Sequence, residues 1–326
     1  MSVNPELSNL EKLREVMLAC VKENGYVMEP LWKKEGELYR NFQAKPDDVW
    51  IMTLPRSGTT VTQEIVYLLM NNFNFETARK FPFFVKVVSI NTSLCPHLWT
   101  NSYVLLPGKD NPGECEVRKV DASKSSAEVY ADLPSPRLFK SHLTFSVINS
   151  ILESGAKTIY VARNPKDRLV SWWKLLPSMA RIPCDVDFAT FWRCVRNEQI
   201  LYEPTWKHIK EGWAQRHNPN VLFLFYEDIR QDLPGAIRKI ANFLGKPCSE
   251  QQIEDTVRYL DIDSFRQHVF GEDTRPDAEQ LRNMFVGKGQ IGGYKDVISP
   301  KIEKEMDDWI EENLRGTDIA FPGLNC

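Results

Sequence analysis

The chain has 326 residues, of which 42% are hydrophobic and 26% are charged. This balance is typical of a folded globular protein and excludes disordered, fibrous and low-complexity classes. The 41 basic and 44 acidic residues leave a net charge of −3, so no overall field attracts nucleic acid, and an anionic ligand would need a local site.

The amino-terminal segment 1–25 is predicted to form an amphipathic helix. Its apolar residues are interrupted by Glu6, Glu11 and Glu15, unlike the continuous apolar core of a signal peptide. The chain has no run of roughly 20 apolar residues, the length that a membrane helix needs. Its seven scattered cysteines show neither a metal-site spacing nor an even count. We therefore expect a cytoplasmic protein with reduced thiols, no membrane span and no bound metal.

Short apolar runs alternate with amphipathic stretches along the rest of the chain. Strands are predicted at 49–54, 137–140, 158–162 and 221–226. Helices are predicted at 59–70, at 144–154, from Pro165 onward, at 227–244 and at 249–260. The following segment, 266–296, has five glycines and no clear periodicity. Strands that alternate with crossover helices indicate an α/β fold, with one domain over 1–326 and a central, mainly parallel sheet flanked by helices.

The segment 95–132 interrupts this alternation. It contains the turn signals Pro107-Gly108 and Asn111-Pro112-Gly113 among scattered charges, which is typical of a long surface excursion. Two interpretations remain open. The segment is either a tolerated insertion or a lid over a substrate pocket.

A first chemical signal lies between the strand at 49–54 and the helix at 59–70, where the chain reads Leu54-Pro55-Arg56-Ser57-Gly58-Thr59-Thr60. A strand that turns into a helix through glycine and hydroxyl residues presents free backbone N–H groups and a positive helix end, which suit a phosphate. The G-x-x-x-x-G-K-[ST] spacing of nucleotide triphosphatases is absent. The alternative is an ordinary helix start with Ser57 or Thr59 as its cap.

Two further strings carry basic residues beside glycines or strand ends. Arg163 follows the strand at 158–162, and Ser171 lies eight residues later, two turns into the next helix, so both side chains can converge on one phosphate. Alone, an arginine in this position is more often a surface ion-pair residue than a ligand-binding one. Near the carboxyl end, Lys288 lies between glycines in a loop over 285–295 that could approach a phosphate through its backbone.

These three strings, in this order, resemble the motifs of the cytosolic sulfotransferase family. The family has a P-K-S-G-T-T loop after its first strand, an R-N-P-K-D string with a serine eight residues beyond the arginine, and an R-K-G-x-x-G loop. The string at 134–143 resembles the strand that carries the catalytic lysine and histidine of the family, and 224–228 is similar to its L-F-Y-E-D. The resemblance covers about residues 26–315 and implies a P-loop-like strand-loop-helix for a phosphosulfate.

The resemblance implies transfer of a sulfuryl group from the co-substrate 3′-phosphoadenosine 5′-phosphosulfate (PAPS) to a small acceptor, without a metal. The nucleotide would contact the residues that match the binding motifs of the family, Arg56, Ser57, Gly58, Thr59, Thr60, Arg163, Ser171, Tyr226, Ser264, Phe265, Lys288 and Gly289. Tyr226 and Phe265 would stack on adenine, although either could be a core residue.

The same resemblance implies three catalytic residues. His142 would act as general base, because an imidazole can take the proton of the acceptor hydroxyl. Lys140 would neutralise developing charge, and Arg56 would stabilise the bridging oxygen of the leaving nucleotide.

The sequence departs from the family pattern at several positions. Arg56 replaces the usual lysine and Val61 the usual tryptophan, while Asp263 replaces a threonine. Gly287 replaces an arginine, and a lost charge-assisted phosphate contact removes about 1.5–3 kcal/mol unless another residue such as Arg282 replaces it. The dimerisation string of the family is not recognisable after residue 295, so no dimer is inferred.

The acceptor is the least determined part of the prediction. Phe83, Phe84 and Trp173 could line an apolar cavity for a phenol, steroid or other hydrophobic alcohol, or they could be ordinary core residues. Three functions remain in view: an active sulfotransferase; an insect-type enzyme resembling retinol dehydratase, which sulfates an allylic alcohol and then eliminates sulfate; and a catalytically weak binding relative. Retention of Lys140 and His142 argues against the third.

Overall fold

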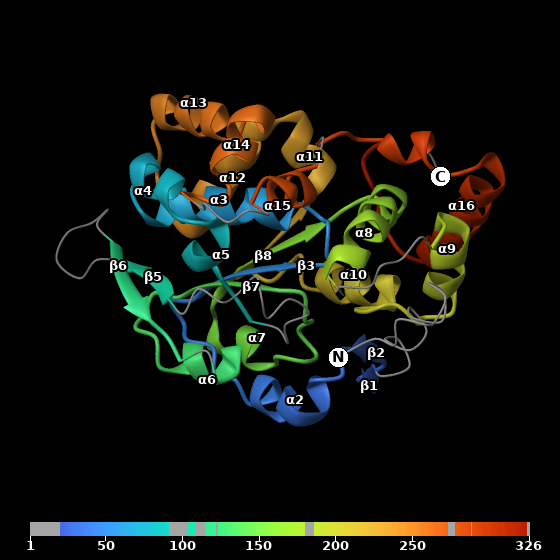
Figure 1. Cartoon of the computed structure of the whole chain (residues 1–326), viewed down its shortest axis with the longest axis horizontal. Helices are drawn as coiled ribbons and strands as arrows, with labels where there is room; N and C mark the ends of the chain where they lie inside the picture. Colours follow the sequence, from blue (N-terminus) through green and yellow to red (C-terminus); the bar gives the residue numbers. More distant parts are fainter. Residues whose placement is uncertain are drawn as a thin grey trace.

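A five-stranded sheet forms the centre of the computed structural model, which describes residues 20–90, 103–107, 115–121, 123–179, 186–272, 278–287 and 289–324. The strand order is β4-β7-β3-β8-β9, and all neighbours run parallel. The strands are β3 (Val49–Thr53), β4 (Val88–Ser89), β7 (Leu138–Ser141), β8 (Lys157–Ala162) and β9 (Val221–Phe225). This confirms the predicted α/β fold with a central parallel sheet (Figure 1).

Helices cover both faces of the sheet because both faces of its strands are apolar. Along β3, Trp50 and Met52 pack into one core cluster, whereas Val49 and Ile51 pack into another on the opposite face. The first cluster receives side chains from α2 (Trp32–Arg40), α6 (Ser126–Ala131), α7 (Ser150–Ser154), α8 (Pro165–Met179), α9 (Phe188–Arg196), α10 (Thr205–Ala214) and α16 (Pro300–Leu314).

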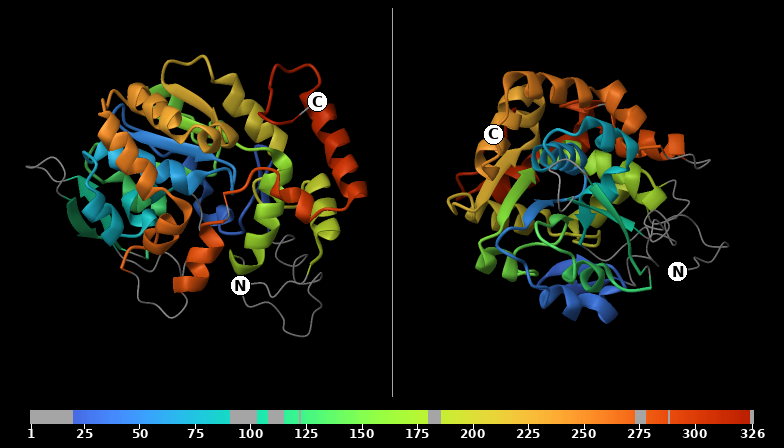
Figure 2. Two further views of the ribbon diagram at one scale, coloured as in Figure 1. Left: turned by 90° about the horizontal axis from the view of Figure 1, so that it is seen from above. Right: turned by 90° about the vertical axis from the view of Figure 1, so that its left-hand side faces the viewer.

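The second cluster is built by the helices above the sheet in Figure 1, and Figure 2 shows the same two-sided arrangement from two further directions. Its members are α3 (Thr59–Met70), α4 (Phe75–Lys80), α5 (Phe83–Lys86), α11 (Tyr226–Gln231), α12 (Leu233–Leu244), α13 (Glu250–Tyr259), α14 (Ile262–His268) and α15 (Ala278–Phe285).

The strand register brings three loops together at one edge of the sheet. Met52 of β3 lies opposite Ser141 of β7 and Tyr160 of β8, so the three strands end at the same level. The loops after these strands begin at residues 54, 142 and 163, which the sequence singled out as chemical signals. An open parallel sheet binds its ligands at this carboxyl edge.

Several predicted elements have different bounds in the structure. The helix expected at 227–244 is two helices, because the Asp232 side chain accepts a hydrogen bond from Gly235 N and begins α12 as a cap. The helix expected at 144–154 is the shorter α7. The segment 266–296, expected to be irregular, contains α15 and a short 3₁₀ helix, η1 (Gly293–Asp296).

The amino-terminal prediction is wrong at its described end. Residues 1–19 lie outside the described residues, but β1 (Val21–Glu23) and β2 (Tyr26–Met28) form an antiparallel hairpin where the helix was expected to continue. The turn between them is Asn24-Gly25, with φ values of 48° and 81°, a pair that favours a tight hairpin over a helix.

Regular structure also replaces part of the excursion predicted at 95–132. β5 (Tyr103–Pro107) and β6 (Cys115–Lys119) form an antiparallel hairpin, and α6 follows. Val104, Leu105 and Leu106 are buried, so β5 belongs to the core. The remaining parts of this segment, at 95–102, 108–114 and 122, lie outside the described residues. Within the described ranges, every helix is too short or too polar to cross a lipid bilayer.

Candidate active site

A cavity of about 570 Å³ opens at the carboxyl edge of the sheet, and most of the predicted site residues line it. The predicted residues on its wall are Arg56, Gly58, Thr59, Thr60, Phe83, Lys140, His142, Arg163, Ser171, Tyr226, Phe265 and Gly289. Ser57, Phe84, Trp173 and Ser264 are described but do not line the cavity, and Lys288 lies outside the described residues. The volume is in the range of small-molecule sites.

The loop between β3 and α3 ends in a bare helix N-terminus. α3 begins after Gly58, and no side chain caps it, so the alternative of Ser57 or Thr59 as a helix cap does not hold. The hydroxyl of Thr59 instead bonds Thr53 Oγ1 at 2.7 Å. The first N–H groups of a helix have no partner within the helix, and the helix end carries a partial positive charge. This end of the cavity therefore fits an anionic group.

His142 follows β7 and is held by the end of β3. Its Nδ1 lies 2.8 Å from the carbonyl oxygen of Thr53. A carbonyl only accepts hydrogen bonds, so Nδ1 carries the proton and Nε2 keeps its lone pair. Burial, followed by the positive charge of Lys140, holds the pKa of His142 well below its ordinary value. The imidazole is therefore neutral at pH 7 and can act as a base.

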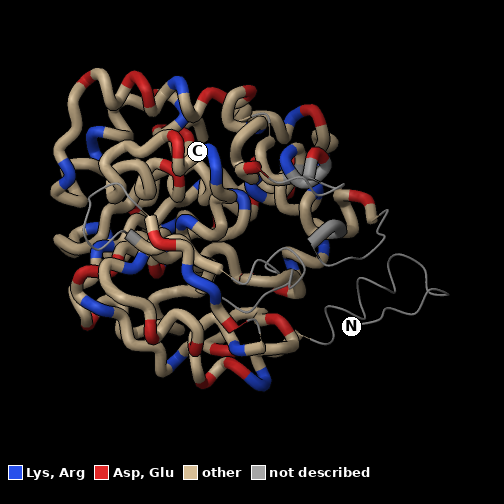
Figure 3. The backbone as a smooth tube through the Cα atoms, turned by 60° about the vertical axis from the view of Figure 1, so that its left-hand side comes forward, with Lys and Arg blue, Asp and Glu red and all other residues tan. Residues whose placement is uncertain are grey.

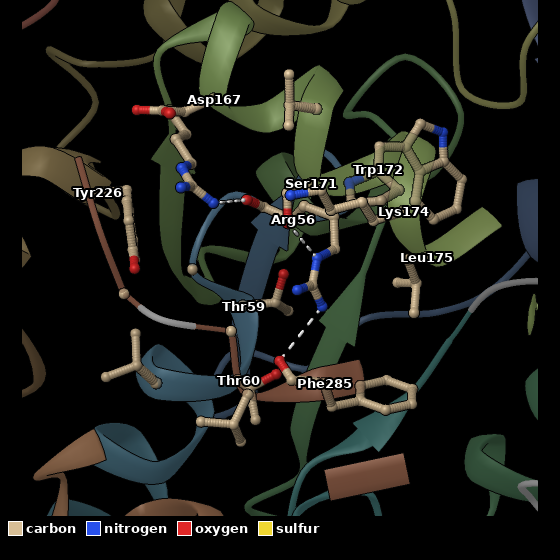
Figure 4. A pocket seen from close by; sticks show the side chains of 18 of the residues that line it. Arg56, Thr59, Thr60, Asp167, Ser171, Trp172, Lys174, Leu175, Tyr226 and Phe285 are labelled. Carbon is tan, nitrogen blue, oxygen red and sulfur yellow. Dashed lines mark hydrogen bonds between the residues drawn. The ribbon is translucent and has the colours of Figure 1, made fainter. Parts of the chain in front are cut away.

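Arg56 joins the loop after β3 to two distant segments. Its Nε donates to Ser171 Oγ at 2.8 Å, and its Nη1 donates to the carbonyl oxygen of Phe285 at 3.3 Å (Figure 4). Burial, followed by the nearby charge of Arg163, lowers the pKa of Arg56 to about 10. The guanidinium therefore remains positively charged at pH 7.

Arg163 lies beside Arg56 at the end of β8. Its Nη1 donates to the carbonyl oxygen of Arg56 at 2.9 Å, and its guanidinium stacks 4.4 Å from the ring centre of Tyr226. Its Nε is buried without a hydrogen-bond partner. Among the described residues, no carboxylate forms an ion pair with Arg56 or Arg163, so the cavity carries positive charge that an anion would neutralise.

The other end of the cavity is apolar with one acidic group. Phe83, Trp172 and Leu175 form part of its wall, and Glu29 lies among them although it is only 3% exposed. Glu29 Oε1 accepts a hydrogen bond from the hydroxyl of Tyr202 at 3.0 Å. The ring of Tyr202 lies 5.5 Å from that of His142, so the acidic group is close to the candidate base.

Two predicted acceptor residues point elsewhere. Trp173 donates its indole N–H to the carbonyl oxygen of Val186 at 2.7 Å and packs on Phe188. One step along α8 turns the side-chain direction by about 100°, so Trp172 takes the place at the cavity that was expected of Trp173. Phe84 packs against Phe270, with ring centres 6.0 Å apart.

The residues that sequence reasoning missed come from unexpected elements. Glu29 follows the amino-terminal hairpin, Tyr202 follows α9, and Arg230 lies in α11. Neither Glu29 nor Tyr202 belongs to a recognisable motif. Arg230 lies two residues after the L-F-Y-E-D string, and this proximity is the only feature of the sequence that indicates a place near the site.

Comparison with known proteins gives a consistent result. A family model described as the sulfotransferase domain matches residues 46–318. The chain is 30% identical to sulfotransferase 4A1 of Homo sapiens over 299 residues, which is 91% of each chain, and 28% identical to sulfotransferase 1E1 of Homo sapiens over 98% of this chain and 99% of that one. Within the described ranges, no group of three or more His, Cys, Asp or Glu side chains is placed to hold a metal ion.

Solved structures are similar over nearly the whole chain. Retinol dehydratase in complex with androsterone and the inactive cofactor PAP superposes with a TM-score of 0.79 at 28% identity, covering 99% of this chain and 98% of that one. Mouse sulfotransferase SULT7A1 complexed with PAP has a TM-score of 0.68 at 21% identity, covering 92% and 95%, which is a likeness of fold.

Proposed function

This chain belongs to the sulfotransferase family and is a PAPS-dependent sulfotransferase, and from that premise we propose that the cavity binds PAPS together with a hydrophobic hydroxylated acceptor. One observation carries the proposal: a bare helix N-terminus, unpaired guanidinium groups and a neutral histidine line the same cavity. We also propose a cytoplasmic location, because the relatives include a cytosolic sulfotransferase of Arabidopsis thaliana.

The residues present fit the two charged ends of the nucleotide. The N–H groups at the start of α3, with the hydroxyls of Thr59 and Thr60, would hold the 5′ phosphosulfate. Arg163 and Ser171 would hold the 3′-phosphate, because a buried guanidinium Nε without a partner supports an anionic ligand there.

The adenine would lie between aromatic rings, as the resemblance implied. Tyr226 and Phe265 both line the cavity although each is less than 9% exposed. Lys288 and Gly289, in the loop between α15 and η1, would add contacts to the 3′-phosphate. Ser57 and Ser264 do not line the cavity, so we expect no side-chain contact from them to the nucleotide.

PAPS supplies a sulfuryl group attached to a phosphate leaving group. His142 would accept the proton of the acceptor hydroxyl at Nε2 while that oxygen bonds to sulfur and the bond from sulfur to the 5′-phosphate oxygen breaks. Lys140 and Arg56 would stabilise the negative charge that develops on the transferred and leaving oxygens. Because Arg56 is charged at pH 7, it can stabilise this negative charge electrostatically.

The acceptor end of the cavity favours an apolar alcohol or phenol. Phe83, Trp172 and Leu175 provide apolar wall, and His142 provides the polar group that fixes the hydroxyl. Retinol dehydratase, a structural relative of this chain, has been solved with androsterone and with retinol, which supports the same class of acceptor here.

A second candidate function is sulfation of an allylic alcohol followed by elimination of sulfate. Similarity to retinol dehydratase over nearly the whole chain favours it. The two functions give different products from the same alcohol: a sulfate ester in the first, and a hydrocarbon lacking both sulfate and hydroxyl in the second.

The experiment that tests the proposal combines binding with product analysis. The desulfated nucleotide 3′,5′-adenosine diphosphate, at a hundred times its dissociation constant, adds about 2.7 kcal/mol of stability and should raise the melting temperature by a few degrees. Mass spectrometry then identifies the product from PAPS with a phenol, a steroid alcohol and an allylic alcohol. No thermal shift at millimolar nucleotide, together with no product, would overturn the proposal.

A further inference from the structure

Arg230 is a basic residue of the cavity wall, and no ion pair with it is found among the described residues. It belongs to α11, one turn after Tyr226, and lines the cavity. Its Nε is buried and makes no hydrogen bond. A guanidinium that loses water without gaining a partner costs free energy, so an unpaired buried donor aimed at a cavity indicates a ligand.

The side chain packs directly on the glycine loop of the cavity. A Cβ at Gly289 would lie 2.9 Å from Nη2 and 3.1 Å from Cζ of Arg230, which places the guanidinium against this glycine. Arg163 reaches the adjoining residue, with Nη2 3.4 Å from the carbonyl oxygen of Gln290. Two guanidinium groups therefore flank the backbone at 289–290.

The nearby carboxylates are engaged elsewhere. Asp167 accepts from the N–H groups of Gly292 and Tyr294 at 2.7 and 3.0 Å. Glu227 accepts from Asn164 N at 3.0 Å through Oε1, and its Oε2 is buried without a hydrogen-bond partner. The acidic residues that begin α14 either cap that helix or pair with Arg266. In the described part of the chain, no carboxylate forms an ion pair with Arg230, although Asp296 also lines the cavity.

We infer that Arg230 is a further binding residue for the 3′-phosphate of the nucleotide, an inference that rests on the proposed function. The family has an arginine at the position of Gly287, which has no side chain that could bind a phosphate. The guanidinium group of Arg230 approaches the same loop from α11. Arg282, the substitute suggested by the sequence, does not line the cavity.

The test compares two nucleotides that differ only in the 3′-phosphate. The dissociation constants of 3′,5′-adenosine diphosphate and 5′-adenosine monophosphate are measured by titration calorimetry for the full chain and for Arg230→Gln. Arg230→Gln should weaken the 3′,5′-diphosphate about 10- to 100-fold and leave the monophosphate within about threefold. Arg258→Gln, which removes an exposed arginine that pairs with Asp255 on α13, is the matched control and should change neither value.

Three results would overturn the inference. Arg230→Gln could weaken both nucleotides equally, which would assign Arg230 to the shape of the loop, or it could weaken neither. Arg230→Lys keeps the positive charge and should therefore retain part of the preference for the 3′,5′-diphosphate. If Arg230→Gln does not fold, Arg230→Lys is compared with the parent in the same way. A loss of preference in Arg230→Lys as large as in Arg230→Gln would contradict a role for the charge. A full chain that does not prefer the 3′,5′-diphosphate would instead contradict the proposed function.

Discussion

Gly58 combines a backbone and a side-chain requirement at a single position. Its φ is 90°, and a Cβ built on it would lie 2.5 Å from the ring of Tyr226. The positive φ alone costs an L-residue about 1–3 kcal/mol. The contact would also push Tyr226 away from the place where we propose that it stacks on adenine.

Gly58→Ala should therefore lose both stability and nucleotide affinity. Gly245→Ala is the matched control, because Gly245 has a φ of 64° but no atom within 4 Å of its Cβ position. Urea unfolding should show a greater loss for Gly58→Ala, and calorimetry should show weaker binding of 3′,5′-adenosine diphosphate for that variant alone. Equal losses in the two variants would mean that contact with Tyr226 is unimportant.

Glu227 should make the free energy of unfolding depend on pH. Burial raises the pKa of this carboxyl from 4.5 to about 6. Between pH 4.5 and 6 the folded protein binds a proton at Glu227 more readily than the unfolded chain does. The contribution of protonated Glu227 to the free energy of unfolding is therefore complete below pH 4.5 and is lost as the pH rises through 6.

Glu227→Gln removes this titration and keeps an oxygen that can accept from Asn164 N. The free energy of unfolding of the variant relative to the parent should rise by about 2 kcal/mol between pH 4.5 and 7, an order-of-magnitude value from the pKa shift. Urea titrations at a series of pH values measure this difference. A difference that does not change with pH would show that Glu227 has an ordinary pKa in the folded protein.

At the scale of elements, a buried ion pair fixes α5 beside the cavity. Lys86 Nζ lies 2.7 Å from Glu64 of α3 and also donates to the carbonyl oxygen of Ala78 at 2.8 Å. The hydroxyl of Tyr259 in α13 donates to the same carboxylate at 2.8 Å. These contacts join four helices, α3, α4, α5 and α13, and position Phe83, at the start of α5, on the cavity wall.

Lys86→Met should destabilise the fold by about 3–5 kcal/mol, because it leaves the Glu64 carboxylate buried and uncompensated. The double variant Lys86→Met with Glu64→Leu should recover part of this loss, since it removes both charges. Urea unfolding of the two variants tests the expectation. A double variant at least as unstable as Lys86→Met would contradict it.

The elements that could be predicted are those whose apolar pattern and end signals agree. The helix α3 and the strands β3, β8 and β9 match their predictions within one residue or better, because each is an apolar run bounded by a glycine or a polar turn. The hairpin of β1 and β2 was not predicted because its apolar residues also fit a helix, although Asn24-Gly25 is a typical hairpin turn.

At the scale of the whole molecule, charge is mixed on the surface and concentrated in the cavity. Figure 3 shows basic and acidic residues interspersed along the chain. The basic residues on the cavity wall outnumber the acidic ones, Glu29, Asp167 and Asp296, whereas the net charge of the chain is −3. Under the proposed function, an anionic nucleotide would be recognised by local geometry rather than by the overall charge.

Whole-chain topology also explains which site residues the sequence could locate. Residues next to strand ends, such as His142 and Arg163, could be placed because parallel strands bring their carboxyl ends together. Tyr202 could not, because its position depends on backbone bonds between Val27 and the loop after α9, with Tyr202 N 2.9 Å from Val27 O. Such long-range pairing leaves no local pattern in the sequence.

The central claim is that this chain transfers a sulfuryl group with His142 as the base. Its most direct test is turnover of PAPS with a hydroxylated acceptor by the full chain, His142→Ala and His217→Ala, where His217 is an exposed histidine that serves as the control. His142→Ala should lose at least about 100-fold in kcat while binding 3′,5′-adenosine diphosphate as before, and His217→Ala should match the parent. Full turnover by His142→Ala would contradict the account.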